Sequence, residues 1–195
     1  ALDIAKGNYV AFVDDDDIIS PCYLQDLYDL ASPDTVSLCY PYAFDDGKLD
    51  EQLPYRITNA YDYCVRNGCK HLSSKVRKFF SGPCMKLIAM SIIQHRRFDV
   101  RFKNGEDSLF MFLISNRINQ VAFTSKDAIY YRRVRINSTA TIYRSFINVF
   151  VNSLKLIIVY VKVYLSNWRN YNFYFFTTRI LGSIKAITNY KKSTY

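Results

Sequence analysis

Residues 5–17 read AKGNYVAFVDDDD, an apolar run that is followed at once by four aspartates. We interpret Asn8–Val13 as a buried strand, because it is a short apolar run bounded by polar residues. A helix pattern follows, with Ser20 as its predicted cap and Pro21 at its first position. Strand, acidic turn and helix form the alternation typical of α/β proteins, and they place the aspartates at the carboxyl end of the strand.

The four aspartates, Asp14 to Asp17, repel one another, and burial would make their ionisation more costly. A divalent cation removes that cost, since Mg²⁺ or Mn²⁺ binds one or two carboxylates together with phosphate oxygens of a substrate. Open α/β sheets bind ligands at the carboxyl ends of their strands, where this cluster is expected. The alternative is a solvated acidic loop whose charge favours the start of the next helix.

A second acidic turn, Asn104-Gly105-Glu106-Asp107, precedes an apolar helix predicted over Ser108–Ile114. Acidic residues in a first turn favour the helix dipole, so capping alone would explain them. A carboxylate in such a turn can also take the proton of an acceptor hydroxyl as that hydroxyl attacks. Both interpretations stay open on the residues alone.

These two turns resemble the signature segments of family 2 glycosyltransferases of the GT-A fold. Residues 5–17 are similar to that family's A-x-G-x-Y-[IV]-x-F-[LV]-D-x-D-D segment, which Asp17 also matches. Arg97-Phe98-Asp99, followed by Gly105-Glu106-Asp107 and Phe110, is similar to its R-F-D…G-E-D-x-x-F segment. The resemblance covers roughly residues 1–140, and the order of the motifs is more specific than any one of them.

The resemblance implies an α/β, Rossmann-like domain that transfers a sugar from a nucleotide diphosphate sugar to a hydroxyl acceptor, with inversion. It implies that Asp16 is the metal ligand beside the diphosphate, with Mg²⁺ or Mn²⁺ as cofactor. Asp14 would contact the nucleoside or the metal, and Asp15 would contribute to nucleotide-sugar binding. Asp107 would be the base, and Glu106 would orient or bind the acceptor, a saccharide or a lipid-linked saccharide.

Two basic segments are also similar to this family. Lys86, in the stretch SGPCMKL, matches a small-residue–x–K-L segment near the donor sugar, and we weigh a substrate contact and a structural role equally. Residues 130–138, YYRRVRINS, resemble a Y-x-Y-R-x-R-x-x-S segment. Period-2 spacing puts Arg133 and Arg135 on one strand face and Arg132 on the other. We expect Arg133 and Arg135 to hold the departing diphosphate, although a charged edge strand is the alternative.

Other expectations concern the elements and the ends of the chain. We expect one strand over Val36–Phe44 and a helix over Lys86–Gln94. The first residue is not Met, and the strands that hold the nucleobase in the family precede the D-x-D segment. We therefore expect a catalytic domain over residues 1–140 that is incomplete at its amino end, followed by a helical tail over residues 141–195.

The tail carries most of the charge asymmetry. The net charge is +9, and residues 126–195 hold twelve Lys and Arg against one acid, Asp127. Residues 144–169 have a helical period with one polar stripe, formed by Arg144, Asn148, Asn152, Lys155, Lys162, Ser166 and Arg169. The wide apolar remainder fits a helix lying on an anionic membrane surface or one packed on protein. The longest charge-free run, Ser145–Leu154, disfavours a membrane span.

Composition excludes several classes of protein. Half of the 195 residues are hydrophobic, so the chain is not disordered. No nucleic-acid motif and no phosphate loop is present, so we expect no nucleic-acid partner and no nucleotide-triphosphate hydrolase. Five cysteines without a C-x-x-C pair favour a cytoplasmic protein, with the cytoplasmic membrane face as an option. A homo-oligomer stays open, as does a catalytically inactive fragment, or a membrane- or partner-binding protein, that acts through the basic tail.

Overall fold

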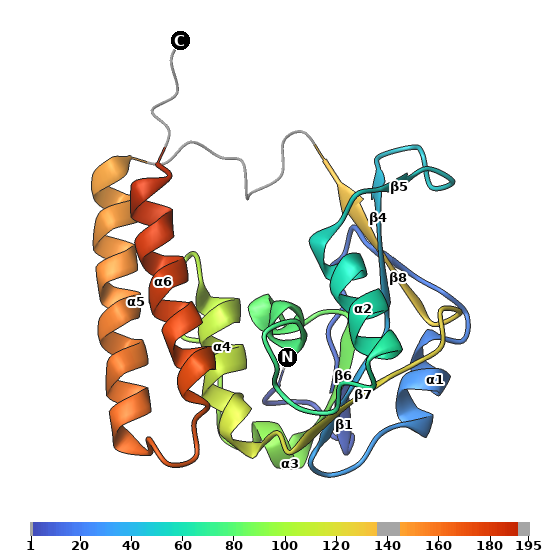
Figure 1. Cartoon of the computed structure of the whole chain (residues 1–195), viewed down its shortest axis with the longest axis horizontal. Coiled ribbons are helices and arrows are strands. Elements are labelled where there is room, and N and C mark those ends of the chain that lie inside the picture. Colours follow the sequence, from blue (N-terminus) through green and yellow to red (C-terminus); the bar gives the residue numbers. More distant parts are fainter. Residues whose placement is uncertain (1, 136–144, 191–195) are drawn as a thin grey trace.

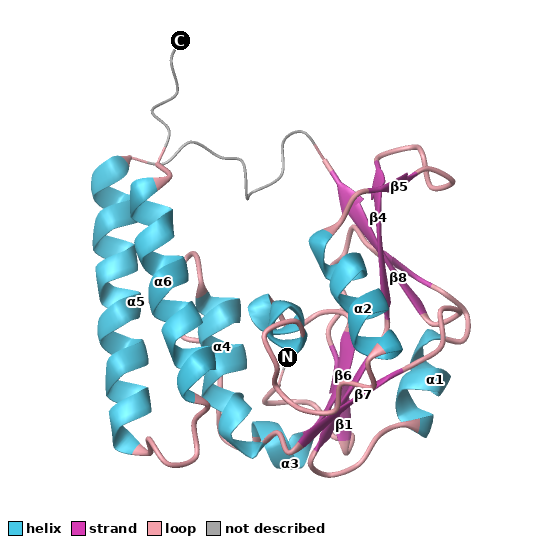
Figure 2. Cartoon of the chain, in the orientation of Figure 1, coloured by secondary structure: helices cyan, strands magenta, loops and turns pink. Residues whose placement is uncertain are grey.

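The computed structural model describes residues 2–135 and 145–190. Within them, the strands form two four-stranded sheets with helices around them, and a pair of long helices stands at one side (Figure 1, Figure 2). This mixture confirms the predicted α/β class. In the first sheet, β6 runs antiparallel to β1 and β3, and β3 runs parallel to β7. Its order is β1 (Tyr9–Ala11), β6 (Lys86–Ala89), β3 (Thr35–Leu38) and β7 (Gln120–Phe123).

The second sheet is centred on a parallel pair, β4 and β8, whose register runs from Tyr40 opposite Ile129 to Asp45 opposite Val134. Its order is β2 (Ile18–Ile19), β8 (Ile129–Val134), β4 (Tyr40–Asp45) and β5 (Gln52–Leu53). The prediction of one strand over Val36–Phe44 is therefore wrong. The chain forms two strands there, in different sheets, and the fully buried Cys39 lies between them.

The shorter helices connect and cover the sheets. Ser20 does not cap the first of them: its hydroxyl donates to the carbonyl of Asp127 (2.8 Å) and accepts from the backbone N–H of Ile129 (2.9 Å). Ser20 therefore joins the start of α1 to the start of β8. These helices are α1 (Tyr23–Asp29), α2 (Arg56–Arg66), η1 (Val76–Ser81), α3 (Met90–Ile93), α4 (Glu106–Ile114) and η2 (Ser115–Arg117).

The helix predicted over Lys86–Gln94 is also wrong for its first half. Residues 86–89 form β6, a strand that is buried along its whole length between β1 and β3. Only Met90–Ile93 is helical. A strand with both faces buried has no alternation of polar and apolar residues, so its sequence cannot be told from a buried helix by periodicity.

The tail folds into two antiparallel helices, α5 (Phe146–Ser166) and α6 (Phe173–Thr188), that pack against α4 (Figure 1). Phe112 of α4 is fully buried at this junction. Its ring stacks on Tyr171 at 4.9 Å and meets Tyr160 edge-on at 5.3 Å. The helix pair therefore shares the core of the sheets. The predicted boundary at residue 140 lies outside the described residues, and the division into two domains stays a prediction.

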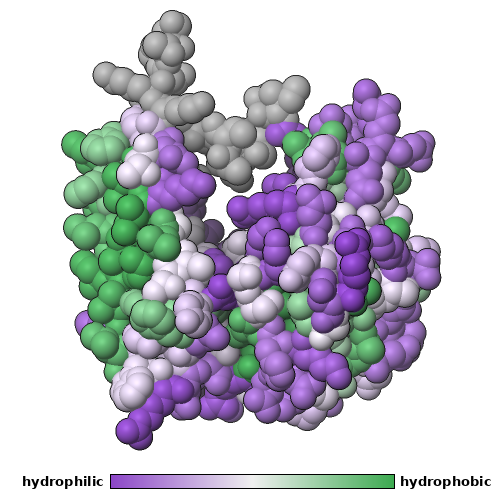
Figure 3. Space-filling model, viewed as in Figure 1, coloured by the Kyte–Doolittle hydropathy of each residue, from purple (hydrophilic) through white to green (hydrophobic). Residues whose placement is uncertain are grey.

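The helix pair turns an apolar face outward. Leu154, Ile158 and Leu165 of α5 are between 46% and 65% exposed, and Figure 3 shows hydrophobic side chains over the α5–α6 side of the molecule. By length and composition alone, α5 is long and apolar enough to cross a membrane, and 17% of its most apolar 18-residue stretch is buried inside the protein. The short charge-free runs of this segment, in contrast, disfavour a span. The polar stripe points the other way: Asn148 and Asn152 line a cavity beside α4. Arg144 of that stripe lies outside the described residues.

We predict that Phe112→Ala lowers the free energy of unfolding by about 3–5 kcal/mol, because the ring is buried against aromatic side chains of both tail helices. Leu165→Ala, at a position that is 65% exposed, should cost less than about 0.5 kcal/mol. Denaturant unfolding measures both values. Equal costs for the two variants would contradict the shared core.

Candidate functional site

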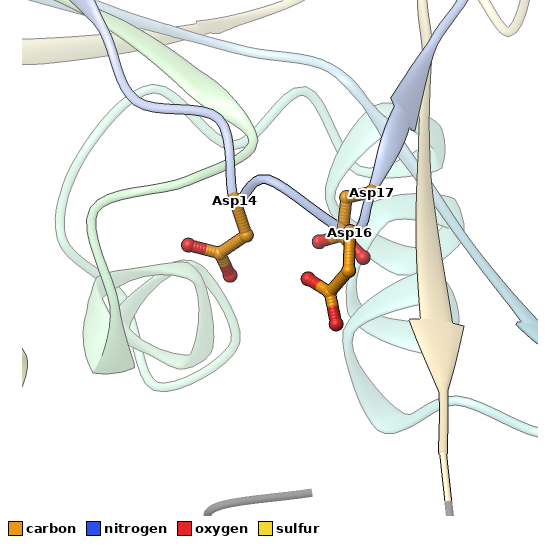
Figure 4. A group of neighbouring side chains, drawn as sticks. All are labelled: Asp14, Asp16 and Asp17. Atoms are coloured by element: carbon orange, nitrogen blue, oxygen red, sulfur yellow. The ribbon is translucent and has the colours of Figure 1, made fainter.

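The loop between β1 and β2 gathers three carboxylates. One oxygen from each of Asp14, Asp16 and Asp17 lies within 4.8 Å of the others, and Figure 4 shows the three side chains on one side of the loop. Asp15 is exposed and stands outside this group. The structure thus brings Asp14 and Asp16 together as the sequence predicts, but the third member is Asp17, which has no part in the predicted metal site.

Strand β8 holds this acidic loop in place. The backbone N–H of Arg133 donates to Asp17 Oδ1 (2.7 Å), and its Nε donates to the carbonyl of Asp16 (2.8 Å). Arg135 Nη2 lies 3.0 Å from Asp16 Oδ2. The hydroxyl of the buried Tyr130 accepts from the backbone N–H of Asp14 (3.1 Å). Three contacts from β8 and one from Arg135, just beyond its end, therefore fix the loop that carries the carboxylates.

Arg133 and Arg135, the predicted diphosphate ligands, contact the acidic loop. Arg133 and Arg135 do share a face, as period-2 spacing predicts, but that face meets the acidic loop. Arg133 Nη1 also pairs with Asp46 at 2.8 Å. The neighbouring Arg132 points to the other face, where it stacks over Tyr55 at 5.4 Å and lines a cavity.

That cavity has a volume of about 350 Å³ and joins both acidic turns. Asp14 and Asp17 line it from the β1–β2 loop, and Asp107 lines it from the first turn of α4. Gly82 is the close neighbour of this last carboxylate, because a Cβ added there would lie 3.9 Å from Asp107 Oδ2. The cavity is completed by Tyr55, Arg56, Ile57, Phe79, Ser81, Pro83, Cys84, Met85 and Arg132.

Asp107 is held at a helix start that only glycine suits. Gly105, the N-cap residue of α4, has a φ of +85°, and a Cβ there would lie 2.7 Å from Leu156 Cδ1 of α5. Desolvation raises the pKa of Asp107, and the neighbouring charge of Glu106 raises that pKa further. Glu106 Oε2 is buried and has no hydrogen-bond partner among the described residues. A raised pKa suits a carboxylate that accepts a proton near neutral pH.

Lys86 lies beneath the cavity, and it is not one of the lining residues. It is fully buried, and its Nζ donates to the carbonyls of Gly82 (2.7 Å) and Cys84. Burial lowers the pKa of Lys86 to about 8, while the charge of Asp107 acts in the opposite direction. Of the two roles weighed for Lys86, the structure favours the structural one: it fixes the turn that borders Asp107.

Arg132 and Tyr55 are among the residues of this cavity that sequence reasoning missed. Period-2 spacing places Arg132 on the strand face opposite Arg133 and Arg135, and the face that carries Arg132 lines the cavity. Tyr55 also lines the cavity, and no sequence motif marks it. The strand period held a usable signal for Arg132, since it separates the three arginines into two sets.

The acidic loop has the donor set that a hard divalent cation requires. Its three carboxylates supply oxygen ligands, and their spacing allows more than one of them to reach the same ion. Arg135 neutralises part of their charge through its pair with Asp16. Burial raises the pKa of Asp17 above its usual range, although the hydrogen bond from Arg133 opposes this. The donor chemistry therefore fits Mg²⁺ or Mn²⁺.

The fold is similar to that of TarS from S. aureus, a glycosyltransferase. The crystal structure of TarS 1-349 in complex with UDP-GlcNAc matches with a TM-score of 0.65 and 18% identity, over 97% of this chain and 51% of that chain. The structure of TarS 1-349 alone gives a TM-score of 0.63 and 18% identity, over 96% and 50%. The chain thus spans about half the length of these structures. No family model and no curated protein matches the sequence.

The comparison shows that this chain shares the fold of about half of TarS 1-349. It confirms the coarse form of the prediction, a mixed α/β domain of the kind found in a glycosyltransferase. At 18% sequence identity, the similarity to TarS establishes the fold of this chain.

We predict that Asp16→Asn, or Asp14→Asn, weakens Mn²⁺ binding to the full-length protein by about tenfold or more, because each removes one charged oxygen ligand. Asp15→Asn is the matched control: it removes the same charge from the same loop, at an exposed position outside the cluster. Titration calorimetry measures the three dissociation constants. An equal loss in all three variants would mean that the loop attracts cations only through its net charge.

Proposed function

We propose that the chain is part of a glycosyltransferase of family 2, with a GT-A fold, that transfers a sugar from a nucleotide diphosphate sugar to a hydroxyl acceptor. The observation that carries the proposal is the cavity shared by the acidic loop and Asp107, because donor-side and acceptor-side carboxylates open onto one space. The fold similarity to TarS, whose crystal structures hold UDP-GlcNAc and UDP, supports a uridine diphosphate sugar as the first donor to test.

The proposed reaction is a single displacement that inverts the anomeric centre. The Asp107 carboxylate takes the proton of the acceptor hydroxyl, and the hydroxyl oxygen forms a bond to the anomeric carbon. The bond from that carbon to the diphosphate breaks, and the electron pair leaves with the nucleoside diphosphate. Asp107 suits the role because it lines the cavity with a raised pKa. Glu106 is proposed to position the acceptor.

The donor end of the cavity is proposed to bind the diphosphate. Asp14 and Asp16 would hold Mg²⁺ or Mn²⁺, and Asp17, the third member of the cluster, is added to this set. When bound, such a cation offsets the negative charge of a diphosphate leaving group. Of the arginines in residues 130–135, Arg132 lines the cavity, and it is proposed to contact the phosphates directly. Arg133 and Arg135 would act through the acidic loop that they hold.

The outward face of the helix pair supports a location at the cytoplasmic face of a membrane. Its exposed side chains include Phe150, Leu154, Ile158 and Trp168, and the charged residues of segment 145–190 are all basic. An exposed apolar face on a segment whose charges are all basic fits the boundary of an anionic bilayer. A lipid-linked saccharide is therefore the acceptor class that we propose to test first. The rival function is a membrane-binding protein that uses this face without catalysis.

We predict that Asp107→Asn lowers kcat for sugar transfer by the full-length protein by about 10²–10⁴-fold, because the amide cannot accept the acceptor proton. Binding of the donor, measured by calorimetry with Mn²⁺ present, should stay within about threefold of the wild-type value. Radiolabelled sugar transfer gives kcat. Full activity of the variant would exclude Asp107 as the base. No transfer by the wild type from any nucleotide sugar would favour the non-catalytic rival.

We also predict the acid side of the pH profile. The base works when deprotonated, so activity falls as pH drops through its pKa, and the raised pKa of Asp107 moves this fall above the value of about 3.9 for a free aspartate. Glu106→Gln removes one cause of the raised pKa and should shift the fall in kcat/KM to lower pH. Glu51→Gln, at an exposed position outside the lining of the cavity, is the control and should shift nothing. An unmoved profile in Glu106→Gln would contradict the assignment.

A further inference from the structure

A second cavity, of about 670 Å³, lies between α4, α5 and α6 and shares no lining residue with the candidate active site. Figure 1 shows these three helices side by side. Its walls come from residues 101–108 at the start of α4, residues 148–160 of α5 and residues 178–186 of α6. Four of the described lining residues are cationic and none is acidic: Arg101, Lys103, Lys155 and Arg179.

Three of these four charges lack a carboxylate. Arg101 pairs with Asp99, at 2.6 Å between Nη2 and Oδ2. No ion pair joins Lys103, Lys155 or Arg179 to an acidic group within residues 2–135 and 145–190. The cavity therefore concentrates positive charge in a concave space, where a field is stronger than on an open surface.

Arg179 is the most enclosed of the three. Its Nη1 donates to Ser108 Oγ (2.6 Å), and the guanidinium lies 4.5 Å from the centre of the Phe175 ring. Its Nε is buried and has no hydrogen-bond partner among the described residues. Burial lowers the pKa of Arg179 to about 10, and the nearby charge of Arg77 also lowers it. A buried cation without a counter-ion is unfavourable, so a bound anion would relieve a real cost.

The surroundings of Arg179 are ordered for binding. Tyr160 and Ser108 form a hydroxyl pair at 3.1 Å, and Ser108 in turn accepts from Arg179, so the guanidinium is fixed. Behind it, Arg179 Nη2 reaches the carbonyl of Arg77 at 3.4 Å, and Arg77 Nε is likewise buried without a partner. Neither guanidinium group has an acidic group among its described partners. A fixed arginine with lysines at the rim is the donor set that holds phosphate groups in proteins.

We propose that this cavity is an anion site that binds a phosphate group, separate from the nucleotide diphosphate. Arg179 contacts the phosphate inside the cavity, and the exposed Lys103 and Lys155 attract it at the rim. The proposal does not depend on the transfer reaction, because it rests on residues outside the candidate active site. The phosphate can belong to a soluble molecule or to a lipid headgroup, since an exposed apolar face flanks α5 and α6.

The test uses inorganic phosphate and the full-length protein, without divalent cations, so that the acidic loop repels the probe. Calorimetry should give saturable binding to the wild type, and Lys103→Gln/Lys155→Gln should weaken it by about tenfold or more. The control is Lys162→Gln/Lys185→Gln, which removes the same charge from exposed positions on the same helix pair outside the cavity. Equal weakening in both double variants, or no binding to the wild type, overturns the proposal.

Arg179→Met separates a binding role from a structural one. Without phosphate, the variant should unfold at the same temperature as the wild type or higher, because it removes a buried cation that has no counter-ion. With phosphate, the wild type should gain stability and the variant should not. A variant that is less stable in phosphate-free buffer and still gains stability with phosphate would make Arg179 a structural residue and overturn the proposal.

Vesicles then identify the source of the phosphate. Co-sedimentation with phosphatidylglycerol vesicles that depends on Lys103 and Lys155, and is absent with phosphatidylcholine, supports a lipid headgroup. Phosphate binding by the wild type, together with vesicle binding that ignores these lysines, supports a soluble phosphate-bearing molecule. Either result keeps the site, and the calorimetry above decides whether the site exists.

Discussion

Charge repulsion among Asp14, Asp16 and Asp17 is the constraint to which the rest of the site conforms. Three carboxylates within 4.8 Å of one another need opposing charge and hydrogen-bond donors to stay together. Arg133 of β8 and Arg135, which directly follows that strand, supply both from a segment that is far away in the sequence. The parallel pairing of β8 with β4 places β8 beside the loop. The second sheet therefore supports the acidic turn.

The parts of the site that could be predicted from the sequence are those with local signals. An apolar run followed by acidic residues places the carboxylates at a strand end, whatever the strand pairs with. In the same way, Glu106 and Asp107 precede an apolar helix, and the first turn of that helix presents them. That Asp14 and Asp107 share a cavity did not follow from any local pattern, because the distance between two turns is fixed by the packing of the whole domain.

What the sequence could not provide depends on burial and on long-range pairing. Lys86 sits in a strand buried on both faces, so periodicity did not separate strand from helix, and its substrate and structural roles stayed equally weighted. Its two carbonyl partners become visible only when the 82–84 turn closes over it. The helical period of α5 likewise left open which face is buried. Asn148 and Asn152 line a cavity. Leu154 and Ile158 face outward, while Leu156 is buried. Amphipathicity gives two faces but does not say which one is buried.

The amino end of α4 links the two cavities. Asp107 lines the cavity that also contains the acidic loop. The next residue, Ser108, lines the basic cavity, where its hydroxyl accepts a hydrogen bond from Arg179. Successive residues of a first helical turn point about 100° apart, so one short helix serves both spaces. Gly105 lets Leu156 of α5 press against the start of this helix, because any side chain there would collide with it. The tail helices thus pack directly against the start of the helix whose first turn carries Asp107.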